Sequence, residues 1–427
     1  MKKDNGKKLW KKSAAVLSAA AVLMGSMMTG CGGKEEEIAS SEPGTGKLTI
    51  LCWSNENDFA PVLDGFKEKY PDIEVDFQHV PSEGNQYQQK LNLLANSEEL
   101  PDIYWINSPI TNFAKNGYMK DLSDMDIVKA LPDTYKDAYS YDGKVYAYAP
   151  DSWVGGMFYN KDLYEEYGFE APRNWDEFLD QAKVFMENGI KPVSMAGTQL
   201  MDMIVWLHNT EDIAKDKTLD EQINTGEKTF SEVYQGAMEK WYEDCVESGI
   251  ITQDMIGITD EQRIDEFASG QAAATLTGAW AISGIKEKNP QMNMGIIPYV
   301  GTEGNAYTMG AVNIGIAMSS KAKNEGNAEL FLEYMASEEG LKAYQAIQDS
   351  FLGAEGVEYE VDPIMEPMKQ YAESGEFYFP SYHWTYTDSM EPMLQKGTQE
   401  IVMGTKTVDE LLKDMDEKID ILIKSEK

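Results

Sequence analysis

Several large aromatic side chains stand beside carboxylates or amides where short apolar runs end. The pattern is clearest at Trp53 with Asn55 and Glu56, and at Asp151 with Trp153. A flat ring next to hydrogen-bonding groups suits the non-covalent capture of a ligand that has both an apolar face and polar edges. The predicted ligand-binding residues are Trp53, Asn55, Glu56, Asn107, Asp151, Trp153, Trp206, Trp280 and Trp384.

The sequence carries no recognisable catalytic signature. It has no GxSxG, HExxH or GxxxxGK[ST] pattern, and it has only 3 His. The 73 Asp and Glu leave a glycosidase pair of carboxylates open as an alternative. Clustered Tyr at 135–148 and 378–386 leave a metal receptor open, although alternating Tyr fits strand packing better. We predict a binding protein with no catalytic residue, metal or cofactor.

The charge balance argues against nucleic acid as a partner. The formal net charge is -36, and the first 30 residues hold six Lys and one Asp, so the acidic excess belongs to the rest of the chain. Nucleic-acid binding needs basic stripes that replace counterions. With 42% hydrophobic and 11% aromatic residues over 427 positions, the chain can fill two cores.

The N-terminus predicts export and lipidation. A Lys-rich segment precedes the apolar run 14–24, which is too short for a comfortable membrane span. Gly30 before Cys31 resembles a bacterial lipobox, with Met28 where Leu is usual. We therefore expect a signal peptide at 1–30, a lipidated (palmitoylated) Cys31 and a flexible tether over 31–46. The protein would be anchored on the outer face of the cell membrane, in a Gram-positive type of bacterium.

The other two cysteines indicate no disulfide framework. Cys52 lies in the strand-like run LTILCW, and Cys245 lies in the helix-like run MEKWYEDCVESG. Both fit small, buried apolar positions.

The segment 47–109 reads as strand, helix, strand, helix, strand. The apolar runs 47–53, 73–77 and 103–106 alternate with helical spacing of apolar residues, which predicts a parallel α/β layer. Ligands of such sheets bind beyond the carboxyl ends of the strands. This rule places Trp53, Asn55 and Glu56 beside Asn107.

Residues 141–168 predict a passage from one lobe to the other. Asp142-Gly143 is a hairpin turn signal, and the chain is expected to become irregular between Pro150 and Met157. Further along, we expect a surface excursion at 215–227 and one long helix at 327–347. Trp175 and Trp241 lie on apolar helix faces and are predicted to be core residues.

Five motifs together resemble one family. They are PDIYW at 101–105, YDGKVYAYAP at 141–150, YNKDLYEEYGFEAPRNWDEF at 159–178, FASGQAAATLTGAW at 267–280 and ASEEGLKAY at 336–344. In this order, together with the lipobox, they are similar to the family 1 extracellular solute-binding proteins. These sugar-binding lipoproteins deliver solutes to ABC importers and include receptors of the maltose-binding type.

The resemblance implies an α/β, type II periplasmic-binding-protein-like fold. Its two discontinuous lobes would comprise 47–152 plus about 305–350, and 153–304 plus about 351–427, joined by hinge strands. It also implies a monomer that captures a carbohydrate, of oligosaccharide size given the many aromatics, by hinge closure. The implied partners are two permease subunits and a cytoplasmic ATPase. A metal or polyamine receptor of the same fold is the alternative, and a glycan-active enzyme is a more distant one.

Overall fold

The computed structural model describes residues 42–81, 86–348, 350–354 and 356–425. The predicted signal peptide, Cys31 and most of the tether lie outside these residues. Within the described part of the chain, no helix combines the length and apolar character needed to span a membrane. Cys52 and Cys245 are both buried and free, as predicted.

The first sheet is built largely from the N-terminal segment. Strand β1 is parallel to β2 and β3, so the predicted strand-helix-strand-helix-strand unit is confirmed. Strand β12, which comes much later in the sequence, runs antiparallel between β3 and β6. In spatial order the strands are β2 (Ile73–His79), β1 (Gly46–Cys52), β3 (Ile103–Ile106), β12 (Gly315–Met318) and β6 (Ala147–Tyr148).

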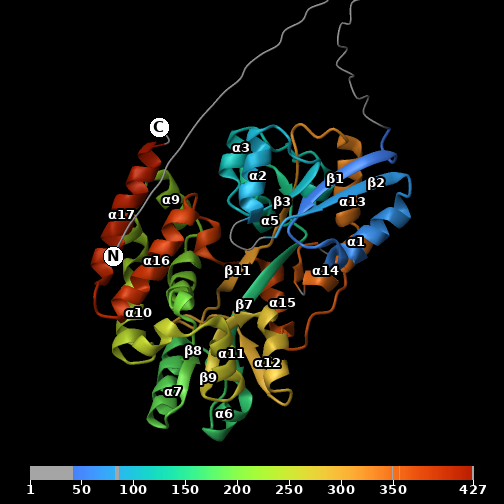
Figure 1. Ribbon diagram of the computed structural model, residues 1–427. Helices are drawn as coiled ribbons and strands as arrows, with labels where there is room; N and C mark the ends of the chain where they lie inside the picture. Colours follow the sequence, from blue (N-terminus) through green and yellow to red (C-terminus); the bar gives the residue numbers. More distant parts are fainter. Residues whose placement is uncertain (1–41, 82–85, 349, 355, 426–427) are drawn as a thin grey trace, which may run out of the picture. The chain divides into compact units, whose positions relative to one another are not determined.

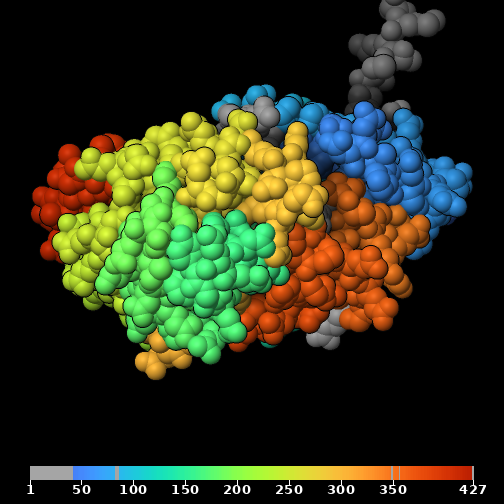
Figure 2. Space-filling model, turned by 90° about the horizontal axis from the view of Figure 1, so that it is seen from below, coloured from blue at the N-terminus to red at the C-terminus, as the bar shows by residue number. Residues whose placement is uncertain are grey.

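Helices from the first third of the chain and from 325–348 pack around this sheet. Figure 1 shows α13 beside α1, β1 and β2, and Figure 2 shows the orange segment near residue 330 next to the blue one. The single helix expected at 327–347 is wrong, because the chain breaks into α13 and α14 around Ala336. The helices are α1 (Glu56–Lys69), α2 (Gln86–Asn96), α3 (Thr111–Lys115), α4 (Asp126–Lys129), α5 (Asp133–Ala138), α13 (Glu325–Met335) and α14 (Glu338–Gln348).

The second sheet centres on the ten-residue strand β7 (Asp151–Asn160). β7 pairs antiparallel with β9, β10, β11 and β13, while β8 is parallel to β9 and β14 is parallel to β11. The partners are β8 (Lys191–Ser194), β9 (Ala272–Gly278), β10 (Met294–Ile297), β11 (Thr308–Val312), β13 (Phe351–Leu352) and β14 (Phe377–Tyr378).

The remaining helices surround this second sheet. In Figure 1, α6, α7, α11 and α12 lie around β8 and β9, while α10, α16 and α17 form a separate helical group. The helices are α6 (Lys161–Glu166), α7 (Trp175–Glu187), α8 (Asp202–His208), α9 (Leu219–Thr225), α10 (Phe230–Trp241), α11 (Asp260–Ala268), α12 (Ile282–Lys288), α15 (Lys369–Ser374), α16 (Thr387–Val402) and α17 (Val408–Ser425). The segment 215–227, predicted as a surface excursion, does lie largely at the surface, but it contains α9, which buries Asp220 and Ile223.

The predicted irregular segment after Pro150 is also wrong, because β7 runs unbroken through Gly155 and Gly156. A Cβ at Gly155 would lie 2.6 Å from the carbonyl oxygen of Thr277, and one at Gly156 would lie 2.2 Å from that of Ile297. The glycines therefore permit close strand packing and do not mark a bend. The predicted hairpin at Asp142-Gly143 is confirmed by the pairing of β4 (Ser140–Tyr141) with β5 (Lys144–Val145).

The chain passes between the two sheets at positions far apart in the sequence. β6 belongs to the first sheet and β7 to the second, with only 149–150 between them; β11 and β12 are likewise separated by 313–314. After α14, which packs on α1, the chain enters the second sheet at β13. The predicted α/β fold of two lobes joined by crossing segments is confirmed.

Candidate functional site

A cavity of about 620 Å³ lies beside the crossing segments. Its wall combines residues of β7, β11 and β13 with the turns that follow β8 and β9. The start of α8, the second and third turns of α16 and the segment 379–382 complete it. The second sheet therefore supplies one wall, and residues of the crossings supply its edge.

Aromatic rings form one side of the cavity. The Trp153 ring lies 5.5 Å from that of Trp280, 5.6 Å from that of Phe379 and 6.1 Å from that of Tyr382, all between ring centroids. Trp280 is 55% exposed, which is unusual for so large an apolar side chain. This side therefore presents exposed ring surface to the cavity.

Gly278 sets the position of the Trp280 ring. A Cβ at Gly278 would come within 2.2 Å of Cζ3 of that ring, so the indole lies directly over the end of β9. Any larger residue at 278 would push the ring away from this position.

Two carboxylates and two amides form the polar side. Asp202 begins α8 and is only 6% exposed, yet within the described part of the chain its carboxylate accepts no hydrogen bond. Burial raises its pKa to about 7; the nearby Arg263 opposes that shift and Glu391 adds to it. Burial also raises the pKa of Glu391, whose Oε1 accepts a 3.3 Å hydrogen bond from Gln395. Oε1 of Gln199 is buried without a partner in the described structure.

The positive charge nearest to Asp202 is engaged elsewhere. Arg263 is fully buried and donates to Oδ1 of Asp260 at 2.6 Å, to Oγ1 of Thr275 at 2.8 Å and to the carbonyl oxygen of Leu276 at 3.1 Å. It therefore acts on Asp202 through space only.

A third buried carboxylate, Asp151, lies at the crossing itself. Its Oδ2 accepts a 2.9 Å hydrogen bond from the Asn313 amide, and its carbonyl accepts one from the Asn313 backbone. Burial raises its pKa to about 6, against the effect of Ser350 and Asn313. The Ser350 hydroxyl is close enough to affect this pKa, yet its geometry with Oδ1 falls short of a hydrogen bond. Asn313 and Ser350 line the cavity, with Asp151 behind them.

The segment 377–385, which carries Phe379 and Tyr382, is held from behind by polar side chains. Asn209 donates to the carbonyl of Tyr378 at 2.8 Å. Asn224 donates to the carbonyl of His383 at 2.7 Å and accepts from the backbone of Thr385 at 2.9 Å. These bonds fix the cavity wall.

A buried ion pair reinforces that wall. Asp220 accepts hydrogen bonds from Tyr234, Tyr378 and Trp384 at 2.7–2.8 Å. Nε2 of His208 lies 3.7 Å from Asp220, and Nδ1 lies 3.0 Å from Asp212. These two acids raise the pKa of His208 to about 9 against the effect of burial, and the pKa of Asp220 is lowered.

The structure brings together only some of the predicted ligand-binding residues. Trp153 and Trp280 line the cavity, and Asp151 lies directly behind its edge. Trp206 and Trp384 do not line it. They are 0% and 1% exposed, and their indole nitrogens donate to the carbonyl of Val300 and to Asp220. We correct both to core residues, because no surface of either ring is open to a ligand.

The four predictions from the first sheet fall outside this cavity. The half-buried Trp53 packs edge-on against Tyr87 at 5.0 Å, and Oδ1 of Asn55 caps α1. Glu56 and Asn107 are exposed. None of these four side chains is among the described residues that line the cavity.

Asp202, Glu391, Gln199, Phe379 and Tyr382 were missed by sequence reasoning. Only Tyr382 had a signal, as part of an aromatic segment before a helix. Asp202 is the first residue of α8, where an acid is ordinarily read as favourable to the helix dipole, and Glu391 lies in the second turn of α16 among other polar residues.

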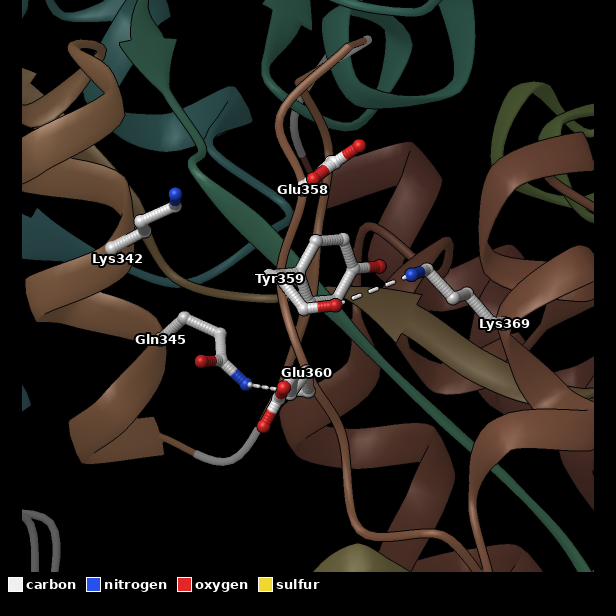
Figure 3. Close-up of a pocket in the computed structure, with 6 residues that line it drawn as sticks. All are labelled: Lys342, Gln345, Glu358, Tyr359, Glu360 and Lys369. Carbon is white, nitrogen blue, oxygen red and sulfur yellow. Dashed lines mark hydrogen bonds between the residues drawn. The ribbon is translucent and has the colours of Figure 1, made fainter.

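A second cavity, of about 610 Å³, is lined by α14, α15 and the segment 358–360 (Figure 3). Its two lysines are occupied: Nζ of Lys369 lies 4.3 Å from the Tyr359 ring centroid, and Lys342 pairs with Glu338 at 2.7 Å. Gln345 donates to the carbonyl of Glu360 at 2.9 Å. This polar, internally paired surface is a poor candidate. The described residues contain no group of His, Cys, Asp and Glu that could hold a metal.

Comparison with known proteins identifies a family, related sequences and a solved structure with a similar fold. A family model described as bacterial extracellular solute-binding protein matches residues 62–354. The multiple sugar-binding protein of Streptococcus mutans is 23% identical over 361 residues, 80% of this chain and 84% of the relative. The melibiose/raffinose/stachyose-binding protein MelE of Bacillus subtilis is 24% identical over 294 residues, 67% and 68% of the two chains. A family 1 extracellular solute-binding protein from Bifidobacterium longum superposes with a TM-score of 0.78 at 25% identity, covering 88% of this chain and 99% of the other.

Proposed function

The chain belongs to the bacterial extracellular solute-binding proteins, and from this premise we propose that it captures a carbohydrate, of oligosaccharide size, for an ABC importer. The curated relatives named above bind sugars. The family consists of solute receptors, so the proposed event is binding and release without covalent chemistry.

One observation carries the proposal: the cavity combines exposed ring surface with hydrogen-bond acceptors that have no donor. A pyranose ring has apolar C–H faces, which stack on aromatic rings, and hydroxyl groups, which donate hydrogen bonds. Trp153 and Trp280 supply the first kind of contact. Asp202 and Gln199 supply the second. A site with unpaired acceptors favours a ligand with hydroxyl groups, because an analogue without them leaves those acceptors unpaired.

Capture would proceed by hinge closure. The ligand would shift an equilibrium between open and closed forms through its greater affinity for the closed form. The crossings at 149–150 and 313–314 and the entry into β13 are the proposed hinge. The hydrogen bonds between Asp151 and Asn313 tie two of these segments together, which supports their moving as a unit.

The lobes would comprise 47–152 plus about 305–350, and 153–304 plus about 351–427. Sheet membership supports most of this division, since β1, β2, β3, β6 and β12 share one sheet and β7 to β10 belong to the other. β11 (Thr308–Val312) departs from it, because it belongs to the second sheet, and this favours a boundary near 313 over one near 305. Trp53, Asn55, Glu56 and Asn107 remain predictions for the first lobe, as ligand contacts in the closed form.

Outside the cavity, the proposal keeps the expectations from the sequence. The protein would be anchored through a lipid on Cys31 to the outer face of a Gram-positive type of cell membrane. It would act as a monomer with two permease subunits and a cytoplasmic ATPase. These assignments rest on the sequence pattern at 28–33 and on the family.

The test is a thermal-shift screen of residues 34–427 against mono- and oligosaccharides. A ligand at a hundred times its dissociation constant adds about 2.7 kcal/mol to the free energy of unfolding, which raises the melting temperature of a protein this large by several degrees. Intact sugar recovered by chromatography would exclude hydrolysis. Ferric iron and polyamines serve as the competing ligands. If only these raised the melting temperature, the sugar assignment would be wrong.

Matched variants tie a positive result to this cavity. Trp153→Ala should abolish most of the sugar-induced shift, because it removes the ring around which the aromatic side is built. Leu93→Ala, at a 62% exposed position on α2, should leave the shift unchanged. Equal shifts in both variants would place the sugar elsewhere.

A further inference from the structure

The charge of the cavity lining is one-sided. Among the described residues that line it, Asp202 and Glu391 are the only ones with a charged side chain, and both are acids. A buried carboxylate without a hydrogen-bond donor is costly. Asp202 is in that position within the described structure, whereas the half-buried Glu391 accepts a hydrogen bond from Gln395. A binding cavity that keeps such an acid calls for an explanation.

Asp202 is built as an acceptor without a donor. Its side chain is more than nine-tenths buried, and it lines the cavity without accepting a hydrogen bond from any described residue. Gln199, from the turn before α8, presents a second buried acceptor, its Oε1. The Asp202 carboxylate and Oε1 of Gln199 can therefore receive hydrogen bonds only from donors outside the described structure.

The groups that face the two acids can be named from each neighbouring element. Around Asp202 these are Arg263 of α11, Glu391 of α16 and the Tyr299 hydroxyl. Around Glu391 they are Asp388 on its own helix and Ser381 and Tyr382 from the preceding segment. Arg263 is the only cation in this set, and Asp260 already holds it.

We propose that Asp202 and Glu391 bind the ligand's hydroxyl groups as ionised carboxylates, so that capture of a neutral sugar releases a proton. This inference rests on the proposed function and deepens it. It assigns two specificity-determining residues and predicts tighter capture in alkaline than in acidic surroundings.

The direction of proton transfer follows from how a bound sugar would change the surroundings of Asp202. Burial and the neighbouring Glu391 already hold the pKa of Asp202 at about 7 in the ligand-free protein. Since Asp202 has almost no water contact left to lose, a bound sugar adds hydrogen bonds and little further desolvation. Hydroxyl donors stabilise the charged form of a carboxyl group, and such charge-assisted bonds are the strong ones. The pKa of Asp202 therefore falls on binding, and the proton leaves. Because the two acids interact, the pair titrates as a unit.

The experiment is isothermal titration calorimetry of residues 34–427 with the best sugar from the screen, at pH 5.5, 7 and 8.5. Each pH is measured in two buffers with different ionisation enthalpies. We expect the dissociation constant to fall, between pH 5.5 and 8.5, by about tenfold for each unit by which binding lowers the pKa. We also expect the binding heat at pH 7 to differ between buffers in the sense of proton release.

Two variants and one control locate the effect. Asp202→Asn should bind about tenfold more weakly than the wild type at pH 8.5 and about equally at pH 5.5, because the amide keeps an acceptor but loses the charge. Glu391→Gln should also reduce the slope with pH. Asp176→Asn, which changes an exposed acid on α7, should keep the full pH dependence.

Each failure has a distinct meaning. A sugar that binds equally at all three pH values, with the same heat in both buffers, would overturn the proton-linked inference and leave the proposed function intact. A pH dependence that survives in Asp202→Asn and in Glu391→Gln, with both variants folded, would overturn the assignment of these residues. If no sugar bound at any pH while iron or a polyamine did, the proposed function itself would be wrong, and the inference with it.

Discussion

Two buried carboxylates on either side of the same cavity wall differ in almost everything except burial. Asp220, behind the segment 377–385, accepts three hydrogen bonds, from Tyr234, Tyr378 and Trp384. Asp202, facing the cavity, accepts none within the described structure. The pKa of Asp220 is lowered, whereas that of Asp202 is raised to about 7.

Burial alone cannot explain this difference, because burial by itself would raise the pKa of both carboxyl groups. What separates them is the supply of donors and of a positive partner. Asp220 has three donors and His208, and it holds the wall together. Asp202 has only the distant effect of Arg263, and its acceptor atoms remain available. A fully satisfied buried acid therefore indicates structure, and an unsatisfied one indicates a place for a ligand.

The largest expected effect comes from removing the satisfied carboxylate. Asp220→Ala leaves His208 with a single acidic partner and three buried donors unpaired. We expect the free energy of unfolding to fall by roughly 3–5 kcal/mol, measured by urea denaturation at pH 7. Asp220→Asn should lose less, because its carbonyl can still accept. A loss below about 1 kcal/mol in the alanine variant would show that the network is not what holds the wall.

Removing the charge of Asp202, the carboxylate without donors, is expected to raise the free energy of unfolding. The unfolded pKa of Asp is about 3.9, and the folded pKa of Asp202 is about 7. Between these values the folded protein binds more protons than the unfolded chain, so Asp202 costs stability as pH rises from about 4 to 7. Asp202→Asn should therefore raise the free energy of unfolding by about 2–4 kcal/mol at pH 8 and change it little at pH 4. A variant less stable at pH 8 than the wild type would remove the distinction between the two acids.

A smaller loss in the free energy of unfolding is expected from Asn224, an uncharged residue that holds the same wall. Asn224→Ala removes two hydrogen bonds to the backbone of His383 and Thr385, for a loss of roughly 1–2 kcal/mol. Unlike the two acids, Asn224 should give the same loss at pH 5 and pH 8. A loss that depended on pH would mean that Asn224 acts through the ion pair.

The sequence predicts the frame of this molecule better than its buried polar groups. The parallel unit β1-α1-β2-α2-β3 follows from apolar spacing, and the turn at Asp142-Gly143 follows from residue type alone. Trp153 and Trp280 were predicted because they stand at a lobe crossing and after a strand. These features depend on residues close together in the sequence, so the sequence alone is enough to predict them.

The remaining site residues depend on contacts that no local pattern encodes. Trp206 has the same kind of neighbours as Trp153, yet it stacks on Tyr299 at 4.7 Å in the core. Asp220 lies in the polar stretch 215–227, which was expected at the surface. Asp202 becomes a cavity residue only because α16 and the turn after β8 meet beside it. Whether a buried acid has donors is decided by segments distant in the sequence.

The smallest expected effect on stability belongs to Trp280, which tests the aromatic side of the same cavity. Trp280 is 55% exposed and touches Trp153 edge to face, so Trp280→Ala should change the free energy of unfolding by no more than about 0.5 kcal/mol. Its affinity for the sugar should nevertheless fall about tenfold, because a ring that the protein leaves uncovered contributes its stacking energy to the ligand instead. Gly278→Ala, which displaces the ring without deleting it, should weaken binding in the same direction. Urea denaturation and calorimetry of both variants give the two numbers. If stability and affinity fell together, Trp280 would be a packing residue, and the contrast between satisfied and available groups would hold for the carboxylates alone.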